Sequence, residues 1–503
     1  MVLELSNIIF TEQDDIVPAS GVEEILNTGV ANTLAGNDRI TGIGNDYGFK
    51  NVATLNTDDG NDTITGTTSA GVGISLSDAS SLDTEKGNDV ITGTGVYGIE
   101  NGSITFTTGE GDDIITGNGH WLDGGGISSR QGIGINNQKP MDTGDGNDTI
   151  TGTNIEFGYG IWNVSDITTG EGNDIITGSS YIDGIHNLSF GTINTGNGED
   201  SIISQGRFYN YGRVFLGNGN DSIIANSDFS EAFVNLNVIE TGDGNDIITS
   251  TGIINDHVIN TGNGDDSLIS QRNFTNWSSV FLGDGNDIIM GTGSIYGVIN
   301  DGGIINTGND EDSIISQGTL INIRGGVFLG EGNDSITANA DLPNRALENY
   351  DAIETEGGND IITSTGVIYN EGIINTGNGD DSIIVDGGVY NNGGSINTGD
   401  GNDSIIANGG FQSGENSSGS VFLGEGEDYI KGFGSGDFYG GNGNDTLDLT
   451  PGSYTVGIWG GGESVIFTKG SSLMITSEFE RLRAGSTIYD FTSLTADQII
   501  IVA

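Results

Sequence analysis

The chain has no cysteine, only 4 prolines and 3 histidines, and 14 lysines and arginines among 503 residues. Without cysteine it forms no disulfide, has no thiol nucleophile and holds no metal through thiolates. The few basic residues stand against 71 acidic ones, a formal net charge of -57. This charge excludes nucleic acid and anionic membranes as partners, because both need basic surfaces, and it favours cations. Such an acidic chain is also prone to disorder when nothing neutralises it.

Long hydrophobic runs are also missing. No segment approaches the roughly 18 apolar residues of a membrane-spanning helix. The N-terminal sequence MVLELSNIIF lacks both the basic region and the long apolar region of a secretory signal peptide. We therefore expect no transmembrane segment, and any export signal must lie elsewhere.

What the chain does have is glycine, 89 residues, and a repeated unit seen clearly in Thr143 to Thr151, which reads TGDGNDTIT. Each copy consists of a six-residue turn that ends on an aspartate and a strand segment of the form x-Ile-x. The copies recur roughly every 24 residues, with 18 terminal aspartates at positions 38, 62, 89, 113, 148, 174, 200, 221, 246, 266, 287, 312, 334, 360, 381, 403, 428 and 445. A fixed period of this length indicates a solenoid, in which chain length only sets the number of rungs.

The pattern predicts an all-β fold, a parallel β-roll or β-solenoid of about 18 rungs. Two positions after each aspartate stands an isoleucine or leucine, which we expect to point into a shared interior and stack on its copies. A rung is expected to contain a turn, a strand, a variable loop and a second strand. We expect an N-terminal cap at 1–34, the solenoid at 35–449 and a C-terminal β cap at 450–503, with strands at 454–459, 465–468, 473–476 and 499–502.

The turn chemistry points to calcium. Glycine occupies the fourth turn position in 17 of the 18 copies and the second in 14, which lets backbone carbonyls converge on one point. Calcium takes oxygen ligands at about 2.3 to 2.6 Å, whereas magnesium demands tight octahedral geometry and transition metals prefer histidine or cysteine. Stacked turns would place carboxylates about 5 Å apart, where each neighbouring pair repels by roughly 3 kcal/mol at an effective dielectric near 20. A cation between turns would replace that repulsion with ligation.

These turns resemble the calcium-binding nonapeptide repeats of the RTX family, GGxGxDxUx. The resemblance implies a parallel β-roll with Ca²⁺ between successive rungs, held by the turn aspartates and backbone carbonyls. Family repeats follow each other every nine residues, so the wider spacing here implies calcium on one edge only, except near Asp437. The implied ligands are Asp38, Asp62, Asp89, Asp113, Asp148, Asp174, Asp200, Asp221, Asp246, Asp266, Asp287, Asp312, Asp334, Asp360, Asp381, Asp403, Asp428, Asp437 and Asp445.

Family members leave the cell by type I secretion with an uncleaved C-terminal signal, which the tail at 490–503 resembles. The resemblance therefore implies a secreted protein, extracellular or on the cell surface, whose partners are calcium ions, the type I secretion machinery and an extracellular or cell-surface polysaccharide. Because repeats fill nearly the whole chain, we expect a structural or adhesive protein and no enzyme.

Two other functions fit parts of the sequence. Some β-solenoids are polysaccharide lyases or epimerases, but His120, His186 and His257 lie in different loops, and only His257 has Asp256 and Arg272 nearby. Some RTX-like adhesins bind ice through a flat array of Thr and Asn on the calcium loops, and here Asn precedes the turn aspartate in 12 of the 18 copies. An outward threonine would be expected at the third turn position. Here that position is mostly acidic or amide, as in Asp145, Glu171, Asn197, Asn218 and Asp243.

Two further residue types recur outside the turns. Asparagines precede Thr-Gly at the turn entry, and we expect them to form a hydrogen-bonded amide ladder: Asn194, Asn260, Asn306, Asn375 and Asn397. Aromatic residues gather in the variable loops, where they either fill the rungs or form a face on which sugars stack: Phe208, Tyr209, Tyr211, Phe274, Trp277 and Phe281.

Overall fold

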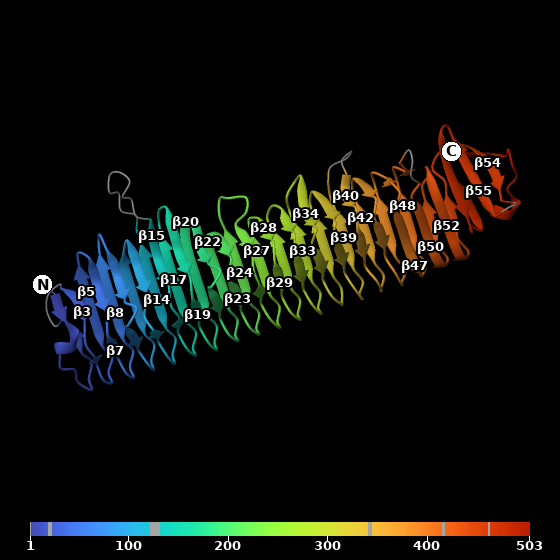
Figure 1. Ribbon diagram of the computed structural model, residues 1–503. Helices are drawn as coiled ribbons and strands as arrows, with labels where there is room; N and C mark the ends of the chain where they lie inside the picture. The colour runs from blue at the N-terminus through green and yellow to red at the C-terminus, as the bar shows by residue number, and fades with distance from the viewer. Residues whose placement is uncertain (1, 19–22, 121–130, 341–344, 415–417, 461–462) are drawn as a thin grey trace, which may run out of the picture. The chain divides into compact units, whose positions relative to one another are not determined.

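The structure is a computed structural model that describes residues 2–18, 23–120, 131–340, 345–414, 418–460 and 463–503. The chain divides into two compact units, Met1–Gly262 and Asn263–Ala503, which we call unit 1 and unit 2 and describe separately. Both are parallel β-solenoids, as the repeat predicts, and the described residues contain short strands and two 3-10 turns but no α-helix. Figure 1 shows the strands of successive rungs lying side by side within each unit.

A rung has three strands where the sequence predicted two. In unit 1, β17 (Thr149–Asn154) follows the turn, β18 (Gly158–Asn163) comes second, and β19 (Asp166–Thr168) leads into the next turn. Both β17 and β18 pair in parallel with β20 (Ile175–Asn187), and β19 pairs with β21 (Thr192–Asn194) of the next rung. The second strand forms in the expected loop because its inward residues are also apolar and fully buried, as at Ile161.

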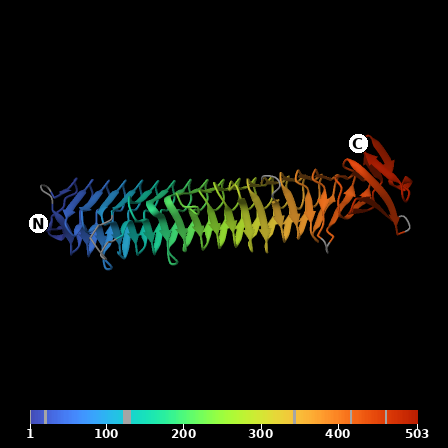
Figure 2. The ribbon, with the colours of Figure 1, turned by 90° about the horizontal axis from the view of Figure 1, so that it is seen from above.

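Unit 2 repeats this arrangement. Its rungs are built from strands such as β42 (Ile361–Ser364), β43 (Val367–Asn370) and β44 (Ile373–Asn375), each paired in parallel with its equivalent one rung later. Figure 2 shows these ladders from a second direction, unit 1 in blue to green and unit 2 in yellow-green to red.

The residue two positions after each turn aspartate points inward and stacks in register, as predicted. Ile150 pairs with Ile176 of the next rung, and both are fully buried. Phe208 and Phe274 also fill the interior, whereas Tyr211 and Trp277 are exposed, so the aromatic residues divide between the two predicted roles.

A second buried column, which we call the asparagine ladder, closes the corner between the second and third strands. Asn163 Nδ2 donates to Asn187 Oδ1 at 2.8 Å and to the Thr192 carbonyl at 3.2 Å. Leu76 interrupts the ladder in unit 1 between Asn51 and Asn101. The members, which bond to one another or to the adjacent backbone, are Asn27, Asn51, Asn101, Asn137, Asn163, Asn187, Asn210, Asn235 and Asn255 in unit 1 and Asn276, Asn300, Asn322, Asn349, Asn370 and Asn391 in unit 2.

Of the predicted turn-entry ladder, the described part of the chain shows one bond between its members, from Asn397 Nδ2 to Asn375 Oδ1 at 2.7 Å. These asparagines lie on the third strands and are only half-buried, so their amides face solvent on one side. The asparagines that carry the long buried ladder end the second strands instead.

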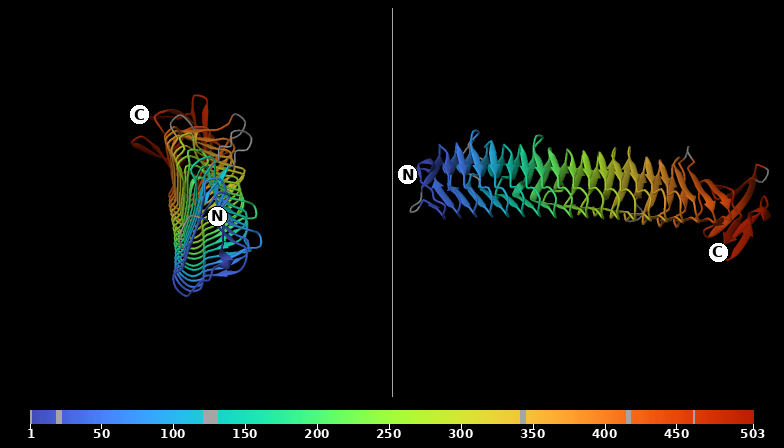
Figure 3. Two further views of the ribbon diagram at one scale, coloured as in Figure 1. Left: turned by 90° about the vertical axis from the view of Figure 1, so that its left-hand side faces the viewer. Right: turned by 90° about the horizontal axis from the view of Figure 1, so that it is seen from below.

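The chain ends differ from the interior rungs. At the start, β2 (Ile16–Val17) and β3 (Glu24–Asn27) already pair as rung strands, so the repeat begins before residue 35. At the other end, β55 (Ser464–Lys469) pairs antiparallel with both β54 (Gly452–Trp459) and β56 (Ser472–Ser477), unlike the parallel strands of the rungs. Figure 3 shows in red how these strands leave the regular stack of rungs.

Candidate functional site

The turn aspartates form a buried column in each unit, which we call the aspartate column. The 18 side chains that end the six-residue turns are all at most 2 % exposed. Asp437, the one other predicted ligand, lies on β52 (Gly436–Gly443) away from the column, where its carboxylate accepts a hydrogen bond from the exposed Ser418 hydroxyl at 2.9 Å. The structure therefore brings 18 of the 19 predicted residues into columns and leaves Asp437 outside them.

One oxygen of each carboxyl, Oδ1, accepts a hydrogen bond from the backbone N–H of the aspartate one rung earlier. Asp113 N–H donates to Asp148 Oδ1 at 2.8 Å, and Asp148 N–H donates to Asp174 Oδ1 at 2.7 Å. The same bond recurs along both units. Each aspartate thus ties its turn to the preceding one.

The ends of the columns are completed by other acidic or backbone groups. In unit 1, Asp15 N–H donates to Asp38 Oδ1 at 2.7 Å. In unit 2, Asp445 N–H donates to Glu480 Oε2 at 2.8 Å, so a glutamate of the C-terminal cap stands where the next turn aspartate would be. The cap therefore satisfies the last N–H of the column.

The second carboxyl oxygen, Oδ2, is buried and has no hydrogen-bond partner in most turns. At Asp360 the hydroxyl of Thr355 donates to it. Burying an oxygen that loses its hydrogen bonds to water and gains none in the protein destabilises the folded state, and burying a charged oxygen destabilises it more. The unpartnered oxygens belong to Asp38, Asp62, Asp89, Asp113, Asp148, Asp174, Asp200 and Asp221 in unit 1 and to Asp287, Asp312, Asp334, Asp381, Asp403, Asp428 and Asp445 in unit 2.

Burial raises the pKa of these carboxyls, and the first residue of the turn tunes the effect. Where that residue is threonine, its hydroxyl opposes the rise, and the pKa of Asp174 beside Thr169 reaches about 6. The Thr169 hydroxyl donates its single hydrogen to the Thr195 carbonyl at 3.1 Å, so it lies beside the carboxyl and leaves Oδ2 without a hydrogen bond. Where the first residue is leucine there is no hydroxyl, and burial raises the pKa of Asp221 to about 8 and that of Asp334 to about 7, a value that Asp148 also reaches in a threonine turn.

Glycine carbonyls line up along the same turns. A Cβ atom on Gly172 would lie 1.6 Å from the carbonyl oxygen of Gly146, and one on Gly146 would lie 1.8 Å from that of Gly111. Both glycines have positive φ, 140° and 155°, so the backbone conformation also requires glycine. Each turn therefore aims the carbonyl of its fourth residue at the next turn, and no side chain can stand between them.

The donor set of two successive turns fits calcium. It consists of unpartnered carboxylate oxygens and glycine carbonyls, all hard oxygen ligands. No group of three or more His, Cys, Asp or Glu side chains comes together as a metal site within the described residues. A cation on this column would therefore have to be shared between turns and held largely by backbone oxygens. A proton is the other species that can neutralise Oδ2.

The outer side of the turn edge carries a second ladder that runs in the opposite direction. Asn147 N–H donates to Asp112 Oδ1 at 2.9 Å, and Asn173 N–H donates to Asn147 Oδ1 at 2.9 Å. These fifth-position side chains are exposed, as are Asp145 and Glu171 at the third position. The outward acidic character of the third position therefore agrees with the sequence prediction, which weighs against a threonine array there.

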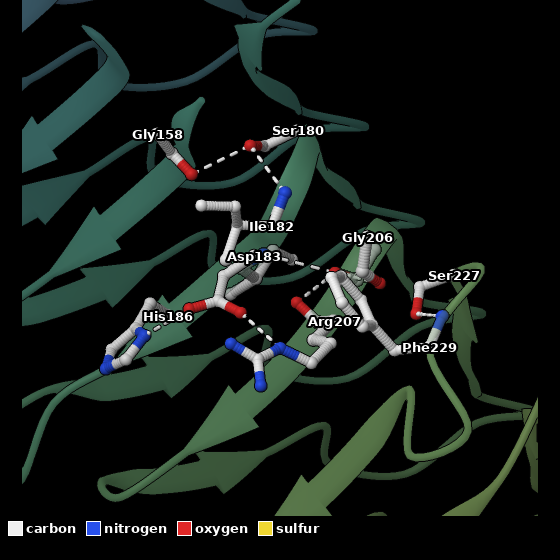
Figure 4. Close-up of polar contacts among 11 residues, drawn as sticks. Gly158, Ser180, Ile182, Asp183, His186, Gly206, Arg207, Ser227 and Phe229 are labelled. Carbon is white, nitrogen blue, oxygen red and sulfur yellow. Dashed lines mark hydrogen bonds and ion pairs between the residues drawn. The ribbon is translucent and has the colours of Figure 1, made fainter. Parts of the chain in front are cut away.

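A different group of side chains gathers on the outer surface of the second strands in unit 1 (Figure 4). Asp183 is almost buried, and both of its oxygens are used: Oδ2 bonds His186 Nδ1 at 2.9 Å and Oδ1 accepts from Arg207 Nε at 2.8 Å. We call the following set the Arg207 cluster: Tyr159, Trp162, Asp183, His186, Arg207, Tyr209, Tyr211 and Phe229.

The rings of the Arg207 cluster stack across three rungs because their positions are in register. Trp162 pairs with His186 and His186 with Tyr209 along the parallel strands. Their ring centroids are 4.8 Å and 5.4 Å apart, with interplanar angles of 22° and 8°. His186 was not identified as part of a site from the sequence alone. Trp162, His186 and Tyr209 are spaced by about one repeat, and that spacing could have predicted that their rings stack.

The other histidines form no comparable group. His120 Nε2 lies 3.0 Å from the Ser69 carbonyl. Asp256 and His257 are exposed after β28 (Ile253–Asn255), and neither takes part in an ion pair within the described chain. The candidate built on His257 therefore gains no support from the geometry.

No protein-family model and no curated protein sequence matches the chain. Among solved structures, the chain is similar to a hyperactive, Ca²⁺-dependent, β-helical antifreeze protein from an Antarctic bacterium, with 17 % identity, a TM-score of 0.27, and coverage of 79 % of this chain and 84 % of that one. At this TM-score the similarity bears on neither site. Within the described residues, no helix is long and apolar enough to span a membrane.

Proposed function

We propose that this chain is an RTX-like calcium-binding repeat protein that serves outside the cell as a structural or adhesive scaffold without catalytic activity. The observation that carries the proposal is the aspartate column, in which buried Oδ2 atoms without partners recur at the same place in turn after turn. A column of this kind needs a neutralising species at each step, and its oxygen-only surroundings suit calcium.

The residues that would hold calcium are the 18 turn aspartates together with the glycine carbonyls of the same turns. Bound calcium supplies the positive charge that offsets the buried carboxylates. The chain's own part is to fix the donors: Oδ1 is held by the N–H of the preceding aspartate, which leaves Oδ2 for the ion. The glycines keep the space between turns free of side chains.

An extracellular location fits this chemistry. Extracellular calcium modules bind at about 10⁻⁴ to 10⁻³ M, far above cytosolic calcium. Inside the cell the acidic turns would repel one another and keep the chain unfolded for type I export, and outside the ions would order rung after rung. The C-terminal tail forms β59 (Ile499–Val502), which pairs with β54, and its role as a secretion signal stays a prediction.

A calcium titration tests the proposal. The chelated protein at neutral pH would be followed by circular dichroism while bound calcium is counted by equilibrium dialysis. We expect a large gain of β signal that saturates in the millimolar range with many ions per molecule, and a smaller gain with magnesium as the matched control. A β signal that stays the same with and without calcium, with no bound ions, would contradict the proposal.

The absence of catalysis needs its own experiment because a β-solenoid can carry lyase or epimerase chemistry. The calcium-loaded protein would be incubated with alginate and with pectin, and the products examined for unsaturated or epimerised sugars. We expect neither product. Appearance of either one would replace the scaffold assignment with an enzymatic one.

A further inference from the structure

The Arg207 cluster presents hydrogen-bond donors to solvent on an otherwise acidic molecule. Its one carboxylate, Asp183, has both oxygens engaged, and its side chain is only 4 % exposed. Arg207 uses Nε for that bond, and its two terminal nitrogens have no partner among the described residues, while 31 % of the side chain is exposed. Asp183 thus positions Arg207 and His186 and leaves the guanidinium fork open.

Aromatic surface surrounds this fork on two sides. The Arg207 guanidinium carbon lies 5.4 Å from the centre of the Tyr209 ring and 5.2 Å from that of Phe229. Phe229 continues toward Tyr181 at 6.2 Å, and Tyr181 toward Phe157 at 5.3 Å. All of these rings except Tyr209 are more than a third exposed.

A groove of about 320 Å³ lies at the far end of this aromatic row, lined by Ile155, Glu156, Phe157 and Tyr181. The row crosses successive rungs, which stand about 4.8 Å apart. A polysaccharide that lies across the rungs would therefore place successive sugar rings against these aromatic side chains and would also reach Arg207. Aromatic rings accept the C–H faces of sugars, and an Arg fork matches a carboxylate with two parallel hydrogen bonds.

We propose that the Arg207 cluster and the adjoining groove bind an acidic polysaccharide, with a uronate carboxylate on Arg207 and sugar rings along Phe229, Tyr181 and Phe157. The inference rests on the adhesive role proposed above and names its ligand class. The charge at Arg207 supports this occupant, because a carboxylate ligand meets open donors there, whereas most of the surface of a chain with net charge -57 would repel it. Glu156 in the groove would also repel a carboxylate, so the proposal places the uronate group on Arg207 and not in the groove.

Unit 2 offers a built-in contrast, which we call the Arg345 cluster: Arg345, Glu348, Tyr350, Tyr369, Glu371 and Asn392. The guanidinium of Arg345 lies 3.5 Å from the centre of the Tyr369 ring, so the cation again covers an aromatic face. Here, however, Arg345 Nη1 already bonds Glu348 at 3.3 Å and Tyr350 at 3.2 Å. With its fork partly used and glutamates at hand, this cluster is not expected to bind a carboxylate.

The test is calorimetry of the full chain, saturated with calcium, against a galacturonate oligosaccharide too short to gel and a neutral oligosaccharide of equal length. We expect the acidic probe to bind better, and Arg207→Gln to weaken it by about tenfold or more because the bidentate contact is lost. Arg207→Lys keeps the charge but not the fork and should weaken binding as well. Arg345→Gln is the matched control and should change it by less than about twofold.

Circular dichroism of every sample, with and without calcium, separates this inference from the proposed function. No binding of the acidic probe to protein that folds normally with calcium would overturn the polysaccharide site and leave the calcium proposal standing. Equal binding of the neutral and acidic probes would overturn it too, as would an Arg345→Gln effect as large as that of Arg207→Gln.

Discussion

Asn163 and Asp148 belong to the same rung of unit 1, are both fully buried, and both continue a column along the solenoid. The Asn163 amide accepts from Asn137 at 2.8 Å and donates to Asn187 at 2.8 Å, so each member satisfies the next. The Asp148 carboxylate accepts a hydrogen bond from the N–H of Asp113 through Oδ1, and no group in the described chain donates a hydrogen bond to Oδ2. An amide carries a donor and an acceptor, whereas an ionised carboxylate carries acceptors alone.

This difference divides the interior into a part that is complete and a part that depends on solution conditions. The asparagine ladder needs no ion and no proton, and it should persist wherever the backbone is folded. The aspartate column needs a cation or a proton at each turn. The turn edge of the solenoid can therefore respond to calcium and pH while the corner between the second and third strands holds the rungs in register.

The largest expected effect is the pH dependence of the calcium-free protein. Burial raises the pKa of Asp62 to about 6, of Asp148 to about 7 and of Asp221 to about 8, from an ordinary value of 3.8. The folded state therefore holds protons that the unfolded state releases, so stability is full below about pH 4 and falls as pH rises toward 8. Each pKa unit between the folded and unfolded states of a group corresponds to about 1.4 kcal/mol of stability.

Thermal unfolding in chelator across this range measures the effect. The transition temperature should fall steeply from mild acid to neutral pH, and added calcium should restore it at neutral pH while changing little near pH 4. A transition temperature that rises with pH in chelator would contradict the assignment of these carboxyls as buried and uncompensated.

Placing a carboxylate in the asparagine ladder is the next largest change. Asn163→Asp removes the donor to Asn187 and to the Thr192 carbonyl and puts a negative charge in the ladder. We expect the free energy of unfolding to fall by about 3 to 5 kcal/mol at neutral pH, since the substitution leaves an unpaired buried charge. Calcium should not rescue this variant, whereas acid should. Rescue by calcium would show that the two columns are not chemically distinct.

The reciprocal substitution has a smaller effect of opposite sign. Asp148→Asn keeps an oxygen for the Asp113 N–H and removes the charge from the Oδ2 position. In chelator we expect the free energy of unfolding to rise by about 1 to 3 kcal/mol, which is the penalty of an unsatisfied buried group. With calcium present, we expect fewer bound ions per molecule. The exposed Asp145→Asn is the control and should lie within about 0.5 kcal/mol of the parent in both conditions.

The sequence was sufficient to predict the solenoid and the aspartate column because both are repeated 18 times with the same neighbours. It did not predict the second strand of each rung or the buried asparagine ladder, because Asn163 and its copies end second strands whose surrounding residues differ from rung to rung. The Arg207 cluster was harder still. Asp183, His186 and Arg207 occur once each, and only the register of the parallel strands brings them together.

The smallest expected effect concerns the first residue of the turn. Leu216→Thr would give Asp221 the hydroxyl that Thr169 gives Asp174, and should lower the pKa of Asp221 from about 8 toward the value of about 6 in the threonine turn. Its reverse, Thr169→Leu, should raise the pKa of Asp174. Because exchanging a buried leucine for threonine also costs packing, the informative quantity is the stability lost between about pH 4 and pH 8 in chelator, not the stability at any one pH. Leu216→Thr should make that loss smaller and Thr169→Leu should make it larger, since the loss from each group grows with the difference between its folded and unfolded pKa values. A change of the same sign in both variants would mean that the hydroxyl does not set how strongly each turn depends on its counter-ion.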